Sequence, residues 1–274
     1  MATLVVTEAS ADARLHKTPL YAAPLDGKKA FDVVNHRILK TKLFQTGLNM
    51  RIWDIIDDLY IGSTEAIRIN GQLSREYPAL QGVKQGIVTS PPSYKVYIYD
   101  LLEQLQKSCI GLTIGDIYLG SPSCADDILL LSSSPYEMQS MVTINEKYSQ
   151  QNQYEIHADP DPKISKSCIT PLYLPGEHKY SENQWEIYGI QLPCTSDFTH
   201  LGLDWLQGKL APDVEARVSK ARQMAYAMLG PGLHGKNGLD PSACFRIIQM
   251  YVTPILLFGL EAAILSKPEI ETLE

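Results

Sequence analysis

Two adjacent carboxylates, Asp126 and Asp127, are the residues of this chain most suited by type and spacing to chemistry. The four apolar residues that follow them, 128–131, predict a buried strand. If residues 121–125 fold back on that strand, the two acids lie at the tip of a hairpin. Adjacent carboxylates repel each other unless a cation lies between them, and hard oxygen ligands suit Mg²⁺. The simpler interpretation is that aspartate is a common turn residue.

A second acid in a matching setting strengthens the hypothesis of a metal site. The apolar run 20–25 ends at Asp26, far from Asp126 in the sequence, and Phe31 and Asp32 follow shortly after it. Only folding can bring the two acid sites together. A glycine-rich loop, Gln81-Gly-Val-Lys-Gln-Gly86, lies between them in the chain.

These three segments together carry a family resemblance. The order Asp-x-x-x-Ala-Phe-Asp (26–32), Gln-Gly-x-x-Gln-Gly (81–86) and Ala-Asp-Asp (125–127) resembles the reverse transcriptase of non-long-terminal-repeat (LINE-like) retrotransposons. Each motif alone is weak, but the ordered set is specific. The resemblance runs from about residue 18 to residue 274.

The resemblance implies an RNA-directed DNA polymerase that joins a primer 3′-hydroxyl to the α-phosphate of a nucleotide. Mg²⁺ is the implied cofactor, and the implied partners are an RNA template, a DNA primer and deoxynucleoside triphosphates. Two divalent ions about 4 Å apart need carboxylates from separate elements. The family motifs assign Asp26 and Asp126 as metal ligands, with Asp127 as a further catalytic acid near them. Asp32 is expected to be structural.

Nucleotide contacts are expected from the first two motifs. Phe31 corresponds to the family position that selects the sugar, because a large ring beneath the sugar clashes with a 2′-hydroxyl; the alternative is an ordinary core aromatic. Gln85 and Gly86 correspond to the loop under the nucleotide and template. Glycine allows close backbone approach and glutamine both donates and accepts hydrogen bonds. The alternative for this loop is a plain turn.

A lysine after the third motif is expected to protonate the pyrophosphate leaving group. Lys163 and Lys166 both fit that family position, and Lys166 is the assigned residue. His157 stands where the family usually has asparagine, and the loop before the lysine is enlarged. The alternative is a solvated lysine.

Nucleic-acid contacts are expected near the C-terminus. Segment 199–203 resembles the hairpin that supports the primer end. Arg217, Lys220 and Arg222 lie within two turns of one predicted helix, which in the family tracks the duplex through sequence-independent phosphate contacts. The alternative is a solvated helix face.

Local patterns predict the elements that must position these residues. A strand ends at Asp26, although Pro24 is awkward in a central strand. An Asn-Gly pair at 70–71 predicts a hairpin. The predicted helices cover 35–45, 49–61, 90–107, 134–151, 214–229 and a segment from 240 that Pro254 breaks, and the other predicted strands cover 114–119, 169–174, 185–191 and 199–203. The residues expected to point inward from the first two helices are Leu39, Leu43, Phe44, Ile52, Ile55, Ile56 and Leu59.

The element order predicts an α+β fold. By the resemblance it comprises an N-terminal remnant (1–17), a polymerase palm (18–208) and a C-terminally truncated helical thumb (212–274). The palm is expected to be an antiparallel sheet with helices on one face. The fingers are expected to be largely absent, because little chain precedes Asp26. The chain alone is therefore expected to be a poor or inactive polymerase, and the alternative function is an inactive palm–thumb remnant with at most weak nucleic-acid binding.

The composition of the chain limits the classes of protein to which it can belong. The 45% hydrophobic content supports a real core, whereas the net charge of −7 counts against a nucleic-acid enzyme unless basic residues cluster locally. The five cysteines show no zinc or disulfide spacing, which favours a reducing compartment. No signal peptide or membrane span is predicted, so an intracellular protein, cytoplasmic or nuclear and not secreted, is expected. A third hypothesis is an unrelated globular interaction protein with aspartate-rich turns.

Overall fold

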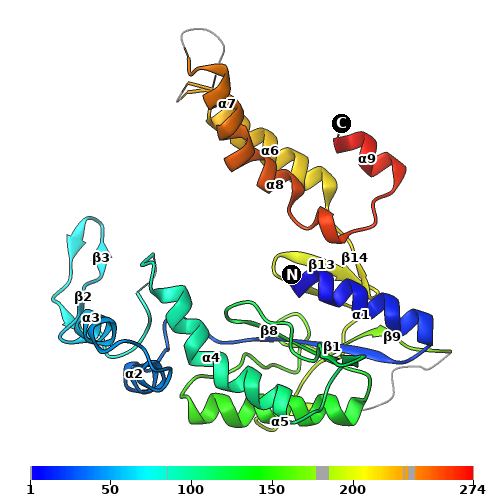
Figure 1. The fold of residues 1–274 in the computed structure, drawn as a ribbon, viewed down its shortest axis with the longest axis horizontal. Coiled ribbons are helices and arrows are strands. Elements are labelled where there is room, and N and C mark those ends of the chain that lie inside the picture. Colours follow the sequence, from blue (N-terminus) through cyan, green and yellow to red (C-terminus); the bar gives the residue numbers. More distant parts are fainter. Residues whose placement is uncertain (1, 85, 177–184, 231, 234–237, 274) are drawn as a thin grey trace.

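The computed structural model is a U-shaped, mixed α/β molecule built around a small antiparallel sheet (Figure 1). It describes residues 2–84, 86–176, 185–230, 232–233 and 238–273. The sheet and its covering helices form the base of the U. One arm consists of α2, α3 and short hairpins, and the other consists of the C-terminal helices (Figure 1).

The central sheet has the strand order β8-β1-β9. Its strands are β1 (Leu20–Asp26), β8 (Asp127–Ser132) and β9 (Thr170–Tyr173). Pro24 is tolerated in the central strand because pairing with β9 ends at Ala22. The backbone N–H of Asp26 points to the β9 side, toward Ser167 Oγ, so by alternation the nitrogen of Pro24 faces the same side, where no ladder bond is needed.

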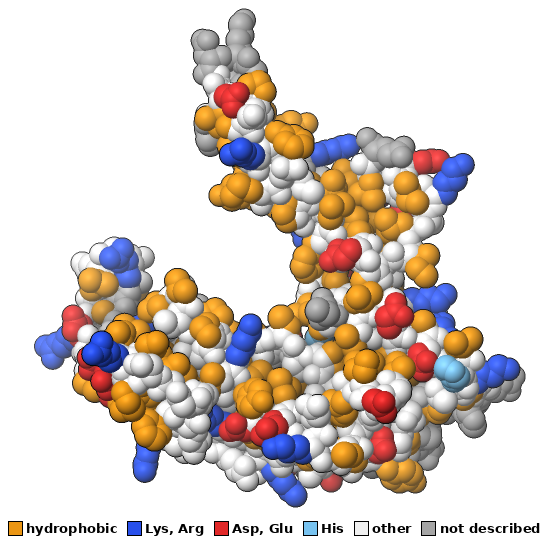
Figure 2. Space-filling view, in the orientation of Figure 1, with side chains coloured by type: hydrophobic (Ala, Val, Ile, Leu, Met, Phe, Trp, Pro, Cys, Tyr) orange, Lys and Arg blue, Asp and Glu red, His pale blue; other side chains and the backbone are white. Residues whose placement is uncertain are grey.

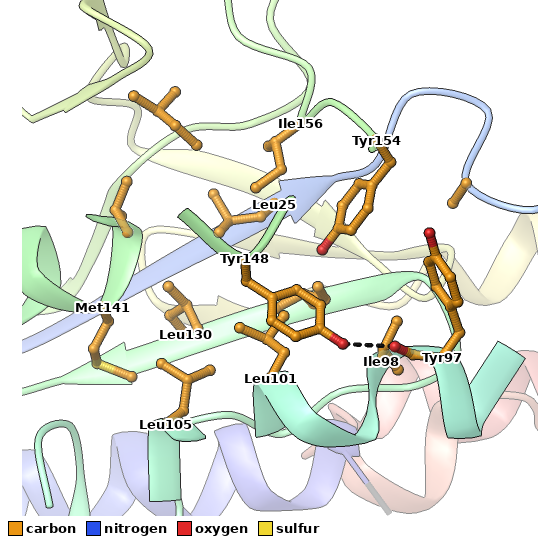
Figure 3. Close-up of a cluster of buried hydrophobic side chains, with 14 of the residues drawn as sticks. Leu25, Tyr97, Ile98, Leu101, Leu105, Leu130, Met141, Tyr148, Tyr154 and Ile156 are labelled. Carbon is orange, nitrogen blue, oxygen red and sulfur yellow. Dashed lines mark hydrogen bonds between the residues drawn. The ribbon is translucent and has the colours of Figure 1, made fainter. Parts of the chain in front are cut away.

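One face of the sheet is covered by α4 (Ser90–Lys107) and α5 (Pro135–Gln151). Leu101 and Leu105 from α4 and Met141 from α5 pack over Leu25 and Leu130 (Figure 3). Burial of each such side chain contributes about 1.5–3 kcal/mol. Both helices begin and end close to their predicted positions, and the predicted cap of α5 is confirmed by the Ser134 side chain, which accepts from the backbone of Glu137.

The other face of the sheet is covered by α1 (Ala2–His16), which buries Val6, Ala9 and Ala13. The expectation of helices on one face is therefore wrong. The physical reason is that β1 and β8 are apolar at consecutive positions, so both of their faces must be removed from water. The helix also reaches the C-terminal half, because Thr7 Oγ1 donates to Ala262 O (3.3 Å) and Arg14 donates to Gly208 O (3.1 Å).

The first arm begins with α2 (His36–Gln45) and α3 (Met50–Tyr60), whose predicted caps Asn35 and Asn49 are confirmed by side-chain hydrogen bonds to backbone N–H groups. Its hairpins pair β2 (Thr64–Glu65) with β5 (Tyr77–Pro78) and β3 (Arg68–Ile69) with β4 (Gln72–Leu73).

Three apolar positions of this arm were expected to point inward and do not. Phe44, Ile52 and Ile55 are 57%, 49% and 62% exposed, whereas Leu39, Leu43 and Ile56 are buried. One face of α2 packs on α4 of the base, and no further layer of the described residues covers the opposite side of the arm (Figure 1).

Two segments predicted as single strands, 114–119 and 185–191, are tight hairpins instead, and segment 199–203 lies in a hairpin, as its resemblance predicted. The hairpins pair β6 (Thr113–Ile114) with β7 (Ile117–Tyr118), β10 (Glu186–Ile187) with β11 (Ile190–Gln191), and β12 (Asp197–His200) with β13 (Leu203–Leu206), to which β14 (Lys209–Leu210) adds. A glycine with positive φ lies in each turn, at Gly115, Gly189 and Gly202. Glycine adopts this conformation without steric cost, so each of these positions reverses the chain.

The second arm contains α6 (Val214–Ala227), α7 (Pro241–Ile247), the π-helical η1 (Ile248–Val252), α8 (Thr253–Leu257), η2 (Leu260–Ala262) and α9 (Lys267–Leu273). The predicted break at Pro254 is confirmed, because the regular helix is interrupted by the π-helical segment η1 just before this proline. Proline lacks the N–H that a regular helix needs. In the part of the chain that the structure describes, no helix combines the length and apolarity required to cross a membrane.

Candidate active site

The two predicted acid sites meet at one end of the central sheet. Asp26, the last residue of β1, lies opposite Asp127, the first residue of β8. A tight turn precedes β8, in which Cys124 N donates to Asp127 O (3.0 Å) and Asp127 N donates to Cys124 O (3.1 Å). Ala125 adopts a positive φ of 56° in this turn, and Asp126 follows it at the tip. The predicted hairpin is thus confirmed, and it brings three carboxylates to the same sheet end.

The surroundings of Asp127 disfavour the charged form of its side chain. Burial raises the pKa of Asp127 above its usual range, and the charges of Asp126 and Asp26 raise it further. Burial and the charge of Asp126 also raise the pKa of Tyr94 on α4. Negative charge gathered in this way favours a bound cation. Among the described residues, no three His, Cys, Asp or Glu side chains are placed to hold a metal ion by themselves.

The backbone of Asp26 is held firmly in place. Its N–H donates to Ser167 Oγ (3.0 Å), and its carbonyl accepts from the N–H of His157 (2.7 Å). Lys166 Nζ lies 3.6 Å from Asp26 Oδ2, with its side chain 67% exposed. Of the two candidate lysines, Lys166 therefore lies beside the acid, while the backbone of Lys163 is engaged in a turn with Asp161.

Phe31 lies close to the acids through its contact with α4. Its ring stacks on Tyr94 with centroids 4.5 Å apart and an interplanar angle of 25°. Because Tyr94 senses the charge of Asp126, Phe31 belongs to the same neighbourhood. Its ring is partly buried and packs against the main core, so the sugar-selecting role and the packing role both stay predictions.

The glycine-rich loop is fastened to the Phe31 segment. Val83 N donates to Phe31 O and Gly82 N donates to Val34 O, both at 2.8 Å. Gly82 has a φ of +91°, and a Cβ there would lie 2.9 Å from Asp32 O, so the position admits no side chain. Gly86 also has a positive φ and open space around its Cα, whereas Gln85 lies outside the described residues.

A cavity of about 380 Å³ opens beside the acids. Asp26, Asp127 and Lys166 line it together with His200 from β12. The imidazole of His200 is 3% exposed, and neither ring nitrogen has a hydrogen-bond partner among the described residues. Burial lowers its pKa to about 4, so the ring is neutral near pH 7.

The predicted phosphate-binding cations on α6 differ in their surroundings. The Arg217 guanidinium donates to Gly202 O (3.2 Å) and lies 4.7 Å from the centroid of the Phe258 ring, so it joins α6 to the β12–β13 hairpin and to the end of α8. Lys220 and Arg222 are exposed. The helix belongs to the second arm, and a broad hollow separates that arm from the first (Figure 2).

Tyr94 and Ser167 had no signal for this site in the sequence, and His200 lay in segment 199–203, which was singled out only as a hairpin. Tyr94 reaches the acids from a helix, Ser167 holds the Asp26 backbone, and His200 forms a wall of the cavity. Each contact joins segments distant in the sequence, so no local spacing could have indicated it.

Comparisons with known proteins agree on one family. Residues 3–180 match the family described as reverse transcriptase (RNA-dependent DNA polymerase). A retrovirus-related Pol polyprotein from the type-1 retrotransposable element R2 of Popillia japonica is 26% identical over 86% of this chain and 32% of the relative. The corresponding protein of the type-2 element R2DM of Drosophila melanogaster is 28% identical over 46% of this chain and 12% of the relative. The chain thus spans about a third or less of the length of these relatives.

Solved structures show the same fold at low sequence identity. Apo telomerase from Candida tropicalis aligns with a TM-score of 0.55 and 16% identity over 95% of this chain and 44% of that chain. The same enzyme in complex with a fragment of telomeric RNA aligns with a TM-score of 0.52 and 13% identity, over 97% and 45% of the two chains.

Proposed function

The chain belongs to the reverse transcriptase (RNA-dependent DNA polymerase) family, and from this premise we propose that it provides the palm and thumb of a LINE-like retrotransposon polymerase. The palm corresponds to residues 18–208 and the thumb to residues 212–274. The reaction is transfer of a deoxynucleotide to a primer 3′-hydroxyl, copied from an RNA template. The R2 names of the relatives support the retrotransposon assignment.

The observation that carries this proposal is the meeting of Asp26 and the Asp126–Asp127 pair at one sheet end. Two-metal nucleotidyl transfer needs carboxylates from separate elements on a rigid frame. Here β1 and β8 supply them side by side, and fully buried neighbouring residues support both strands.

The residues present fit a pair of Mg²⁺ ions held by Asp26 and Asp126. Burial, and then the charges of Asp126 and Asp26, raise the pKa of Asp127, and a cation would offset the contribution of those charges. Mg²⁺ commonly takes one or two protein carboxylates plus substrate phosphates, so a complete set of protein ligands is not required. When bound, the ions stabilise the charge on the attacking and leaving oxygens.

The chain's own side chains supply the remaining roles. In this proposal Phe31, which stacks on Tyr94, excludes a 2′-hydroxyl, and the open space at Gly86 accommodates the nucleotide. Lys166 Nζ lies beside Asp26 and is the proposed proton donor to the pyrophosphate leaving group. Lys220 and Arg222 can contact the duplex backbone, while Arg217 holds their helix against the β12–β13 hairpin.

Primer extension on poly(A)/oligo(dT) with Mg²⁺ and dTTP tests the proposal directly. We expect weak extension at most by the purified chain and the loss of that extension in Asp126→Asn, with duplex binding unchanged. Asp116→Asn is the matched control, because Asp116 is exposed in the β6–β7 turn. Synthesis that survives Asp126→Asn contradicts the site. Absence of synthesis by the wild-type chain, with duplex binding retained, supports the inactive remnant instead.

A further inference from the structure

The first arm contains a groove that the proposed chemistry does not use. It has a volume of about 790 Å³ and lies between α2, α3 and the segment 78–80. We call it the α2–α3 groove. Its walls carry both cationic and aromatic side chains, chiefly His36, Arg37, Lys40, Phe44, Trp53 and Tyr60.

Two aromatic rings form the outer part of the groove. Phe44 and Trp53 meet edge to face, with centroids 6.1 Å apart and an interplanar angle of 80°. Trp53 Nε1 donates to Lys40 O (3.3 Å), which fixes the indole against α2. Phe44 is 57% exposed, so ring surface remains available to a flat ligand. A rigid, exposed aromatic pair is the kind of platform on which unpaired bases stack.

The charge of α2 differs from that of the whole chain. The helix contains one arginine and two lysines and no acidic residue, although the chain carries a net charge of −7. Lys40 is paired with Asp57 (2.5 Å), and Lys42 points into the core. Arg37 is exposed and forms no ion pair within the part of the chain that the structure describes. A guanidinium at the rim of an aromatic groove fits a phosphate group.

The α2–α3 groove adjoins a second hollow that reaches the glycine-rich loop. This second hollow of about 610 Å³ shares His36, Tyr60 and the segment 78–80 with the groove and extends to Asp32 and Lys84. His36 and Tyr60 form the common wall, with ring centroids 4.5 Å apart. The far end of this second hollow is the glycine-rich loop, which is bonded to the Phe31 segment. A strand that runs along this loop therefore passes into the groove.

We propose that the α2–α3 groove binds unpaired RNA, with bases stacked on Phe44 and Trp53 and a phosphate at Arg37. This inference rests on the proposed function, because a polymerase that copies RNA has a single-stranded template to bind. The combination of one unpaired cation and two ring surfaces fits a nucleotide better than it fits a purely apolar protein segment.

Tryptophan fluorescence provides the test. The chain has three tryptophans, and Trp185 and Trp205 are only 4% and 1% exposed. Trp53 is the partly exposed one, so stacking on it should quench a measurable share of the emission. We expect saturable quenching by an octamer of uridine. In Trp53→Phe the quenching disappears, while binding of the same labelled octamer, followed by anisotropy, is kept.

Variants of the groove separate this site from general charge attraction. Phe44→Leu should weaken octamer binding by about tenfold or more. Arg37→Gln should weaken it several-fold and lower its salt dependence. The matched controls are Arg51→Gln and Tyr136→Leu, which remove an exposed cation and an exposed aromatic ring outside the groove. Equal losses in the controls, or no binding of RNA at all, overturn the proposal.

Failure of the groove and failure of the proposed function give different results. Asp126→Asn should quench normally, because it lies outside the groove. Octamer binding by a chain that extends no primer leaves the groove supported and the polymerase proposal contradicted. If the wild-type chain extends a primer but Phe44→Leu and Arg37→Gln bind the octamer as well as the wild type does, the groove proposal is overturned and the polymerase proposal is not.

Discussion

Replacement of His200 by leucine should remove an acid-sensitive component of the stability of the fold. Burial lowers the pKa of His200 from 6.5 to about 4. The unfolded state therefore binds a proton at a higher pH than the folded state does. The resulting loss of stability begins as the pH falls below about 6.5 and is complete below about 4. One pKa unit corresponds to about 1.4 kcal/mol, so the full effect is on the order of 3 kcal/mol.

At neutral pH the same substitution should cost little or stabilise the protein. Leucine is close to histidine in volume, and both ring nitrogens of the buried His200 lack partners among the described residues. A buried polar group without a partner costs about 1–3 kcal/mol, which leucine avoids.

Urea unfolding followed by circular dichroism, repeated at several pH values, measures the effect. The free energy of unfolding of His200→Leu minus that of the wild type should rise by about 2–3 kcal/mol between pH 7.5 and pH 4.5. The exposed His16→Gln serves as the control, because its side chain is 60% exposed. Parallel pH profiles for the wild type and His200→Leu would refute the reasoning, since they would mean that the ring protonates as readily in the folded state as in the unfolded one.

Three further substitutions test other parts of the structure. Phe31→Val should raise incorporation of ribonucleotides relative to deoxynucleotides by about tenfold, measured by competitive primer extension; an unchanged ratio would return Phe31 to a packing role. Asp127→Asn should increase the free energy of unfolding at pH 7 by up to about 1 kcal/mol, because the raised pKa of Asp127 means that its ionised form opposes folding. In acid the carboxyl is protonated in both states, so the gain should vanish. Lys42→Met should lower the free energy of unfolding in urea by about 2–3 kcal/mol, because Lys42 Nζ donates to Tyr97 O (2.8 Å) and to the Tyr148 hydroxyl in the core. The control Lys107→Met changes a side chain that is 71% exposed and should cost almost nothing. Equal losses in the two variants would contradict this account.

Much of the fold could be predicted from the sequence where local signals decide the structure. The ends of α2, α4 and α5 follow from Asn35, from the prolines after Ser90 and from the Ser134 capping box. These signals work because caps and prolines act on the backbone beside them. The tyrosine-rich side of the same core was less predictable. Tyr148 donates its hydroxyl to Tyr97 O (2.6 Å), a contact that depends on how two helices cross (Figure 3).

The helix α1 could not be predicted because its apolar positions are few and small. Val6, Ala9 and Ala13 form a modest stripe, and only the apolar second face of β1 and β8 makes them a core. The residues of the candidate site likewise fall into a group that local motifs mark and a group that they do not. Asp26, Asp126 and Asp127 could be assigned because short motifs mark them. Tyr94 and His200 join the site only through packing between distant segments, which leaves no trace in local spacing.

The position of α1 has a consequence for the order of folding. Thr7 and Arg14 bond to residues 255 and 194 positions later in the chain. During synthesis the helix therefore leaves the ribosome long before the residues that it contacts. Its apolar side chains stay exposed to water until those residues have been made. Contacts of such large sequence separation raise the contact order and slow folding. We expect the sheet with α4 and α5 to form first and α1 to dock last, as the step that joins the base of the U to its second arm.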